Sequence, residues 1–355
     1  MVQFGGKVAL AFGLSIAGGL STCIGGIIIF FRRMVQLASP RTLSISLSLS
    51  AGVMIFISLV GIFGKCVRSY QKGFQTMVVN NTLSCGELGF KFDNLTSEGL
   101  YNCFHCDTIC EGHSWLATTA TFALGGLIIF GMDYIVHCIS PESHPEAEME
   151  VSHINKLRSS PIRTSGDNEE SQCDIEPVEC VKKAINNNCD NELCSRFSKR
   201  QLHRSGVLTA LAIGLHNIPD GVACYVGAIG DTRVGAALAI GIALHNIPEG
   251  FAVATPLYFA TGSRIKALMW TFVSALAEPL GAVLAWLIIG EGLDPFVEGV
   301  MFGIVCGMMV TISFKELVPK AIKFYSEGNT VIFSILFGMA TMAFSLILFA
   351  YAGAD

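Results

Sequence analysis

Charged residues are scarce in this chain. Only 14% of its 355 residues are Asp, Glu, Lys or Arg, whereas 52% are hydrophobic. An average soluble domain carries about 25% charged residues. The formal net charge of −5 gives nucleic-acid binding no electrostatic support. The composition therefore argues against a nucleic-acid-binding protein and an ordinary soluble enzyme, and it favours a polytopic membrane protein.

The sequence also lacks the alternating stretches of about 10 residues that build a transmembrane β-barrel. It contains instead eight apolar runs, each close to the roughly 20 residues that cross about 30 Å of hydrocarbon. Backbone polar groups in lipid must be paired within their own segment, so we expect these runs to be helices. We predict an all-α polytopic membrane protein with eight transmembrane helices at residues 8–31, 43–63, 115–138, 206–229, 233–258, 265–290, 296–314 and 330–352.

The distribution of Lys and Arg sets the predicted orientation. Most of them lie in the loops that follow the first, third, fifth and seventh runs. The same side still carries more Lys and Arg when the long 139–204 loop is left out of the count. By the positive-inside rule, both termini then lie outside the cell or in an organelle lumen. We expect residence in the plasma membrane, with an organelle membrane as the alternative.

Two hydrophilic loops divide the chain into three parts. Residues 1–138 hold the first three spans and an outer loop at about 64–114, and residues 205–355 hold the last five spans. Residues 139–204 are rich in acidic and basic side chains and show no apolar periodicity. We therefore expect this segment to be a cytosolic, mostly disordered loop.

The outer loop carries two glycosylation acceptors, Asn80 and Asn94, each followed two residues later by Thr. It also carries five cysteines, which on the oxidising side of a membrane favour disulfides, with one cysteine left over. The alternative is a metal site that combines the CxxC at 103–106 with neighbouring histidines. The cysteines are Cys66, Cys85, Cys103, Cys106 and Cys110, and the histidines are His105 and His113.

One hexapeptide occurs twice in the second half of the chain. Residues 216–221 read HNIPDG and residues 245–250 read HNIPEG, so the copies differ only by Asp for Glu. They lie at comparable depth in two consecutive, antiparallel spans. Duplicated helices interrupted by proline indicate a transporter site near the midplane of the bilayer.

Each copy brings three kinds of donor to one face of a helix. Residues at i, i+3 and i+4 are neighbours on a helix surface, and these are His216, Asn217 and Asp220 in one copy and His245, Asn246 and Glu249 in the other. The proline has no N–H, so it frees the carbonyl oxygen four residues before it. Imidazole and carboxylate ligands suit Zn²⁺ and other first-row divalent ions, whereas Ca²⁺ and Mg²⁺ sites need no histidine.

A cation is missing from these two spans. No Lys or Arg lies inside either span except at the ends, so the buried carboxylates have no side chain of opposite charge within their own helices. A single histidine or acid would be explained by a hydrogen bond or an ion pair. Two copies of the motif are better explained by a divalent metal ion that supplies the positive charge.

Further intramembrane candidates lie outside the repeat. Glu278 stands beside a proline in the sixth run, and we predict that it is a ligand or a gate. Met54 in the second run offers a thioether, although such a residue usually serves packing. Asp133, His137 and Glu316 lie near the cytosolic ends of their spans and form a possible exit relay; the alternative for Glu316 is pairing with Lys315 or Lys320.

These motifs resemble those of the ZIP (Zrt-/Irt-like protein) family, and most closely its GufA-like branch. The matching segments are HNIPDG at 216–221, HNIPEG at 245–250, AEPLGA at 277–282, SAGVM at 50–54 and FKELVP at 314–319. The resemblance covers all eight spans and leaves out only the two long loops.

The resemblance implies an eight-helix transporter, often dimeric, that moves divalent metal toward the cytosol through a binuclear site in the fourth to sixth spans. By motif position, the first ion would be held by His216, Asp220, His245 and Glu249. The second would be lined by Asn217, Asp220, His245, Glu249 and Glu278. Asn246 belongs to the same motif, and Met54 would be a thioether on the outer side.

We therefore predict a transporter and not an enzyme. Zn²⁺ is the expected substrate, with Fe²⁺, Mn²⁺ and Cd²⁺ as further candidates, and we expect no resident cofactor. The expected partners are the metal ions, the lipid bilayer and a second copy of the chain. One alternative is a metal sensor or receptor that signals through the 139–204 loop. The other is a zinc-dependent intramembrane hydrolase, but the HExxH arrangement of helical metalloproteases is absent.

Overall fold

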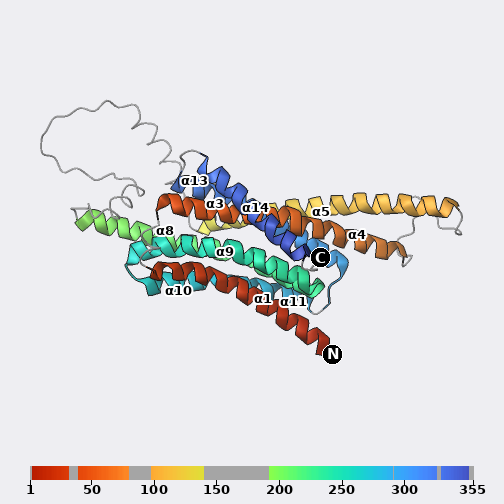
Figure 1. Ribbon diagram of the computed structural model, residues 1–355, viewed down its shortest axis with the longest axis horizontal. Coiled ribbons are helices and arrows are strands. Elements are labelled where there is room, and N and C mark those ends of the chain that lie inside the picture. Colours follow the sequence, from red (N-terminus) through yellow and green to blue (C-terminus); the bar gives the residue numbers. More distant parts are fainter. Residues whose placement is uncertain are drawn as a thin grey trace, which may run out of the picture.

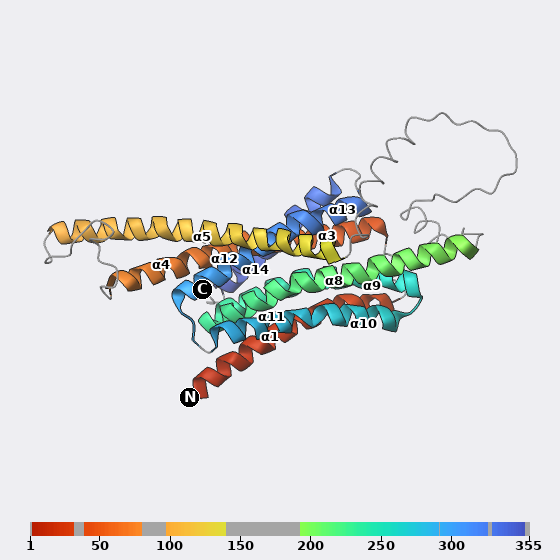
Figure 2. The same ribbon diagram turned by 180° about the vertical axis from the view of Figure 1, so that it is seen from behind.

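The computed structural model describes residues 2–31, 39–79, 97–139, 192–290, 292–325 and 329–351. Throughout these residues the regular secondary structure is helical and contains no strand, which confirms the all-α class. The helices form an elongated bundle, seen from two sides in Figures 1 and 2. The start of α1 and the end of α14 lie toward the same end of it, as an even number of crossings requires (Figure 1).

The elements follow the predicted spans closely. Within the described residues, seven helical segments are long and apolar enough to cross a membrane, and the remaining predicted span, 206–229, is also helical. The elements are α1 (Val2–Ile27) with the short η1 (Ile28–Phe30), α3 (Pro40–Phe56), the π-helical η2 (Ile57–Ile62), α4 (Phe63–Val79), α5 (Ser97–Ile139), α8 (Glu192–Gly230), α9 (Thr232–Thr261), α10 (Arg264–Ala275), α11 (Ala277–Ile289), α12 (Pro295–Ile312), the π-helical η4 (Ser313–Leu317), α13 (Val318–Phe324) and α14 (Thr330–Tyr351).

Polar residues at the turns start the helices. The side chains of Ser39, Asp231, Ser263 and Asp294 each accept a hydrogen bond from a backbone N–H in the first turn of the helix that follows. Gly262 ends α9 with a left-handed φ of 65°, which a residue without Cβ adopts freely. Tight turns therefore connect α8 to α9 and α9 to α10, so these consecutive helices lie side by side.

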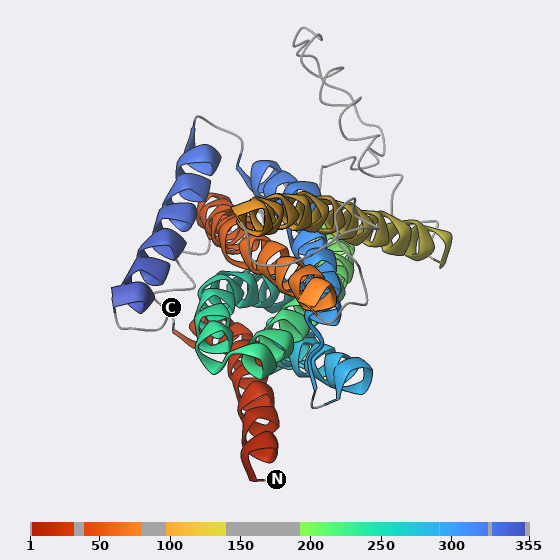
Figure 3. The same ribbon diagram turned by 90° about the vertical axis from the view of Figure 1, so that its right-hand side faces the viewer.

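The helices form two groups. One group contains α1, α8, α9, α10 and α11, and the other contains α3, α4, α5, α12, α13 and α14. The groups meet mainly where α3 packs against α9 and α12 packs against α8. Figure 3 views the bundle along its long axis, with α14 at one edge. The two helices that carry the repeated hexapeptide thus lie in the same group and face the other group.

The glycines that end the two hexapeptides bring neighbouring helices close together. A Cβ on Gly221 of α8 would collide with the backbone carbonyl of Glu278 at the start of α11. A Cβ on Gly250 of α9 would likewise collide with the carbonyl of Thr22 of α1. Small residues allow this close packing of membrane helices. The repeat therefore fixes the positions of α1 and α11 as well as its own side chains.

The described parts of the predicted outer loop at 64–114 are helical. α4 continues the second span to Val79, and α5 begins at Ser97. The two helices extend together beyond the rest of the bundle (Figures 1 and 2). No proline interrupts 63–79, and the rings of Tyr70 and Phe74 pack against Phe296 of α12. This packing explains why the polar character of the segment does not end the helix.

The end of the predicted cytosolic loop at 139–204 is helical, contrary to the expectation of disorder for this part. α8 begins at Glu192, so residues 192–204 are helical. They include Glu, Leu, Lys, Arg and Gln, which are strong helix formers. The expectation of disorder for the rest of this loop concerns 140–191, which lie outside the described residues.

The outer cysteines are only partly described. Cys66 is a free, fully buried thiol in α4, and its Sγ lies 3.1 Å from the carbonyl oxygen of Gly299. It therefore packs against α12, and the described part of the chain contains no disulfide. Cys85 and the acceptors Asn80 and Asn94 lie outside the described residues, as do the side chains of Cys103, Cys106 and His105.

Candidate metal centre

Both copies of the hexapeptide lie in unbroken helices. α8 runs through Pro219 and α9 runs through Pro248, so the predicted interruption is absent. Hydroxyl groups of α3 bond the backbone near the second proline: Ser50 donates to the carbonyl of His245 at 3.3 Å, and Ser46 donates to that of Pro248 at 3.1 Å. Serine side chains commonly satisfy backbone groups near a proline in membrane helices.

The candidate ligands are buried together. The side chains of His216, Asn217, Asp220, His245, Asn246, Glu249 and Glu278 are each no more than 3% exposed. Ionisable groups inside a membrane protein are costly, so they persist where they pair with something or serve a function. The partners of each side chain therefore decide what this cluster does.

His245 faces Asp220 through one ring nitrogen. Its Nδ1 lies 3.1 Å from the carbonyl oxygen of Gly241, which can only accept a hydrogen bond, so we place a ring proton on Nδ1. Nε2 lies 3.3 Å from Asp220 Oδ2, and this contact is a hydrogen bond when Nε2 also carries a proton, whereas without that proton Nε2 can bind a metal ion. A ring oriented by a backbone carbonyl through one nitrogen, with the other nitrogen toward the site, is the usual arrangement of a metal-binding histidine.

Glu249 is held from the other group of helices. Ser50 of α3 donates a hydrogen bond to Glu249 Oε1 at 2.7 Å. Sequence analysis had included this serine in the SAGVM segment but had singled out Met54 instead. Met54 lies one turn further along α3, buried in the apolar core. A serine in an apolar helix gives no local signal that its hydroxyl meets a carboxylate two hundred positions away.

Glu278 lies against α1 and α9. Asn246 donates through Nδ2 to Glu278 Oε2 at 2.9 Å and to the carbonyl of Gly18 at 3.1 Å. A Cβ on Gly18 would collide with Glu278 Oε1, so this glycine makes the space for the carboxylate. Gly18 was not predicted as a site residue, because glycine is common throughout membrane helices.

The α8 copy contacts α10 and the π-helical η4. Asn217 donates to the carbonyl of Ser274 at 3.2 Å. His216 Nε2 lies 3.1 Å from Oε1 of Glu316, whose Oε2 lies 3.0 Å from Nζ of Lys320. The structure thus brings Glu316 directly to the repeat, and it also shows the pairing with Lys320 that sequence analysis gave as the alternative.

Asp133 and His137 are the other predicted members of the exit relay. Both lie in α5, but their side chains fall outside the described part of the structure.

Four buried oxygens of the site have no hydrogen-bond partner among the described residues. They are Asn217 Oδ1, Asp220 Oδ1, Asn246 Oδ1 and Glu278 Oε1. A buried polar group without a partner is destabilising, and all four are acceptors. Only donors or a cation would satisfy them.

The donors do not form a finished cage. Within the described ranges, no three His, Cys, Asp or Glu side chains converge closely enough to hold one metal ion as they stand. The site consists instead of adjoining pairs, such as His245 with Asp220 and Asn246 with Glu278. Rotation of these side chains would be needed to gather them on an ion. A loosely organised site suits a substrate that must leave again.

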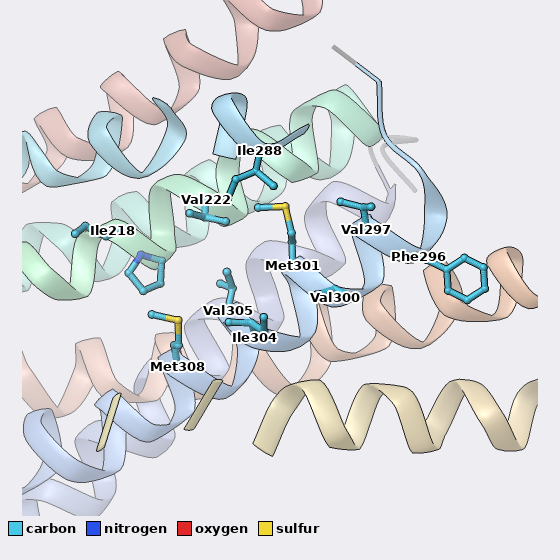
Figure 4. Close-up of a pocket in the computed structure, with 11 residues that line it drawn as sticks. Ile218, Val222, Ile288, Phe296, Val297, Val300, Met301, Ile304, Val305 and Met308 are labelled. Atoms are coloured by element: carbon cyan, nitrogen blue, oxygen red, sulfur yellow. The ribbon is translucent and has the colours of Figure 1, made fainter. Parts of the chain in front are cut away.

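The opposite face of α8 is apolar. Ile218, Pro219 and Val222 line a cavity of about 440 Å³ together with Ile288 of α11 and residues of α12 that include Val305 and Met308 (Figure 4). Its lining offers no nitrogen or carboxylate oxygen ligand. The polar side chains His216 and Asp220 of α8 therefore face η4 and α9, while the apolar side of α8 faces this cavity.

A bundle of membrane-spanning helices with nitrogen and oxygen donors buried between them defines a transporter of cations. Residues 97–346 match the family described as ZIP zinc transporter. The chain is 34% identical over 344 residues to the zinc transporter ZupT of Nitratidesulfovibrio vulgaris, covering 97% of this chain and 98% of that protein. It is 36% identical over 347 residues to ZupT of Lysinibacillus sphaericus, with the same two shares. It is 35% identical over 343 residues to ZupT of Corynebacterium efficiens, again covering 97% and 98%.

The chain therefore belongs to the ZIP family. It is a multi-pass membrane protein that transports divalent metal ions, and the prediction that it is a transporter and not an enzyme is confirmed.

Proposed function

We propose that this protein carries Zn²⁺ from outside the cell into the cytosol and that the two hexapeptides hold the ion on its way. The observation that carries the proposal is the set of four buried, unpartnered oxygens beside two histidines. Neither α8 from Ser205 onward nor α9 after Arg233 contains a Lys or Arg. A divalent cation supplies the missing positive charge and satisfies the acceptors at the same time.

The ligand sets follow from the motif positions. We propose that His216, Asp220, His245 and Glu249 hold one ion, and that Asn217, Asp220, His245, Glu249 and Glu278 line a second. Asp220 suits a bridging role, because Oδ2 faces His245 while Oδ1 is unpartnered. Asn246 orients Glu278 through its amide group and keeps its own oxygen unpartnered. Met54 remains the proposed thioether on the outer side.

The choice of ion rests on the donors and on the relatives. Imidazole with carboxylate is a typical zinc environment, and it also accepts Fe²⁺, Mn²⁺ and Cd²⁺. The relatives described above are zinc transporters by name. We therefore propose Zn²⁺ as the principal substrate and the other three ions as weaker ones.

The proposed orientation of the chain rests on its charge distribution. The excess of Lys and Arg on one side supports cytosolic loops after the first, third, fifth and seventh spans, with both termini outside. Glu316 then lies on the cytosolic half, and we propose that it receives the departing ion, with Asp133 and His137 further along the exit. We further propose that the protein resides in the plasma membrane and forms a homodimer. Its outer loop would be glycosylated at Asn80 and Asn94 and would form disulfides among its remaining cysteines.

Uptake of radiolabelled zinc by cells that express the protein tests this function. We expect His216→Ala and Glu249→Ala each to abolish uptake while surface labelling shows normal amounts of protein. Gly13→Ala is the matched control, because a Cβ at this position meets nothing within 4 Å. Unchanged uptake in both variants would refute the assignment. Saturable binding without flux in proteoliposomes would instead indicate the sensor alternative.

A further inference from the structure

Glu316 uses its two carboxylate oxygens for two different partners. It lies in the π-helical η4, which joins α12 to α13, and Oε1 is 3.1 Å from Nε2 of His216. Oε2 is 3.0 Å from Nζ of Lys320, one turn later in α13. One carboxylate therefore connects a candidate metal ligand with a fixed positive charge.

These three groups form a path from the interior toward the surface. The side chain of His216 is 3% exposed, that of Glu316 is 26% exposed and that of Lys320 is 32% exposed. An ion that leaves His216 toward the more exposed side meets the carboxylate of Glu316 first. Imidazole and carboxylate are both ligands of first-row divalent ions, so this pair would slow the departure of the metal.

Lys320 opposes that retention. Its ammonium group occupies one oxygen of Glu316 and repels a dication at the other, and partial burial weakens the screening by salt. Exposed pairs at i and i+4 stabilise a helix only slightly, so helix stability alone explains little of this arrangement. The neighbouring Lys315 does not take this place, because its Nζ lies over the ring of Phe130, 4.8 Å from the centroid.

We propose that Lys320 is a positioning residue for ion release: it keeps Glu316 a low-affinity release point and prevents the exit from holding the metal. This inference rests on the proposed function of the same site, since it assumes that the ion passes Glu316.

Equilibrium binding of zinc to the purified full-length protein tests the proposal. We expect Lys320→Gln to bind zinc about 10-fold more tightly, because it removes the repulsion between a fixed ammonium group and a nearby dication. Lys320→Arg keeps the charge and should bind like the unmodified protein. The double variant Glu316→Gln with Lys320→Gln should lose the gain, because the carboxylate that the lysine restrains is gone.

The controls separate this role from a structural one. Lys323→Gln removes an exposed charge from the same helix and should leave the affinity unchanged. If Lys320→Gln fails to fold, Lys320→Met preserves most of the aliphatic side chain and gives the same comparison. Unchanged affinity in the neutral variants, or a gain that persists without Glu316, would overturn the inference. Absence of zinc flux through the unmodified protein would instead overturn the proposed function.

Discussion

The two hexapeptides have nearly the same sequence and very different surroundings. In the α9 copy, His245 is completely buried and lies between the carbonyl of Gly241 and Asp220. In the α8 copy, His216 lies beside Glu316, whose side chain is 26% exposed and paired with a lysine. The histidine is thus enclosed within its own helix group in one copy and contacts a partly exposed carboxylate of the other group in the other copy.

The asparagines differ in the same way. Asn217 of the α8 copy donates to a backbone carbonyl at Ser274, whereas Asn246 of the α9 copy donates to the side chain of Glu278. The α9 copy also receives a hydrogen bond from Ser50 of the other helix group. A repeat in the sequence therefore supplies the same donors twice, and the neighbouring helices give the two copies different partners.

The largest expected difference between the copies concerns the number of bound ions. His245 belongs to both proposed ligand sets, so His245→Ala should weaken zinc binding at both by at least about 100-fold. His216 belongs only to the first set, so His216→Ala should remove one ion and retain the other. Equilibrium dialysis with radiolabelled zinc measures the stoichiometry. If both variants lost the same number of bound zinc ions, the two copies would contribute equally to binding, and the comparison would fail.

Two glycines of α1 offer the next comparison. Gly18→Ala should displace the flexible carboxylate of Glu278 and reduce zinc uptake by at least about 10-fold in a protein that still folds. Gly25→Ala should instead collide with the backbone carbonyl of Ile247 and destabilise the packing of α1 on α9 by about 1–3 kcal/mol. Uptake assays and thermal unfolding distinguish the two. A stability loss at Gly18 with normal specific uptake would contradict the role given to this glycine.

Loss of the hydrogen bond from Ser50 to Glu249 is expected to reduce zinc affinity by a smaller factor. Ser50→Ala should weaken zinc affinity by about 10-fold, because the carboxylate loses the group that orients it. Ser46→Ala is the matched control, since its hydroxyl bonds the carbonyl of Pro248 on the same pair of helices without touching the carboxylate. Isothermal titration with zinc compares the two variants, and equal affinities would show that Ser50 has only a packing role.

The smallest effect is expected from making the repeats identical. Asp220→Glu lengthens the side chain that faces His245 and should change zinc uptake by less than about 10-fold while altering the ratio of zinc to cadmium uptake. Competition uptake with both ions measures this ratio. An unchanged ratio would mean that the shorter carboxylate of the α8 copy has no part in selecting the ion.

Sequence alone predicted the membrane-spanning segments, because continuous apolar runs indicate helices whatever their neighbours are. It also predicted the residues of both hexapeptides, whose polar groups stand out in apolar surroundings. It did not predict the helices at 64–79, 97–114 and 192–204. The first is stabilised by aromatic packing of Tyr70 and Phe74 on Phe296, a contact between distant segments.

The missed contacts of the site have the same origin. Ser50 and Gly18 are ordinary residues in their own helices, and each acquires its place from a carboxylate that the fold brings close. Lys320 is four residues from Glu316 and was considered a partner, but the approach of His216 from another helix carries no signal along the chain. Local patterns therefore predict donors, and tertiary packing decides how they are oriented.

X-ray absorption at the zinc edge of the loaded, purified protein tests the central claim most directly. We predict a first shell of nitrogen and oxygen atoms at about 2.0–2.2 Å, with an imidazole contribution that His245→Ala removes or strongly reduces. A sulfur shell at about 2.3 Å, which would place the ion on cysteines, would contradict the account. An imidazole signal that is unchanged by His245→Ala would contradict it equally.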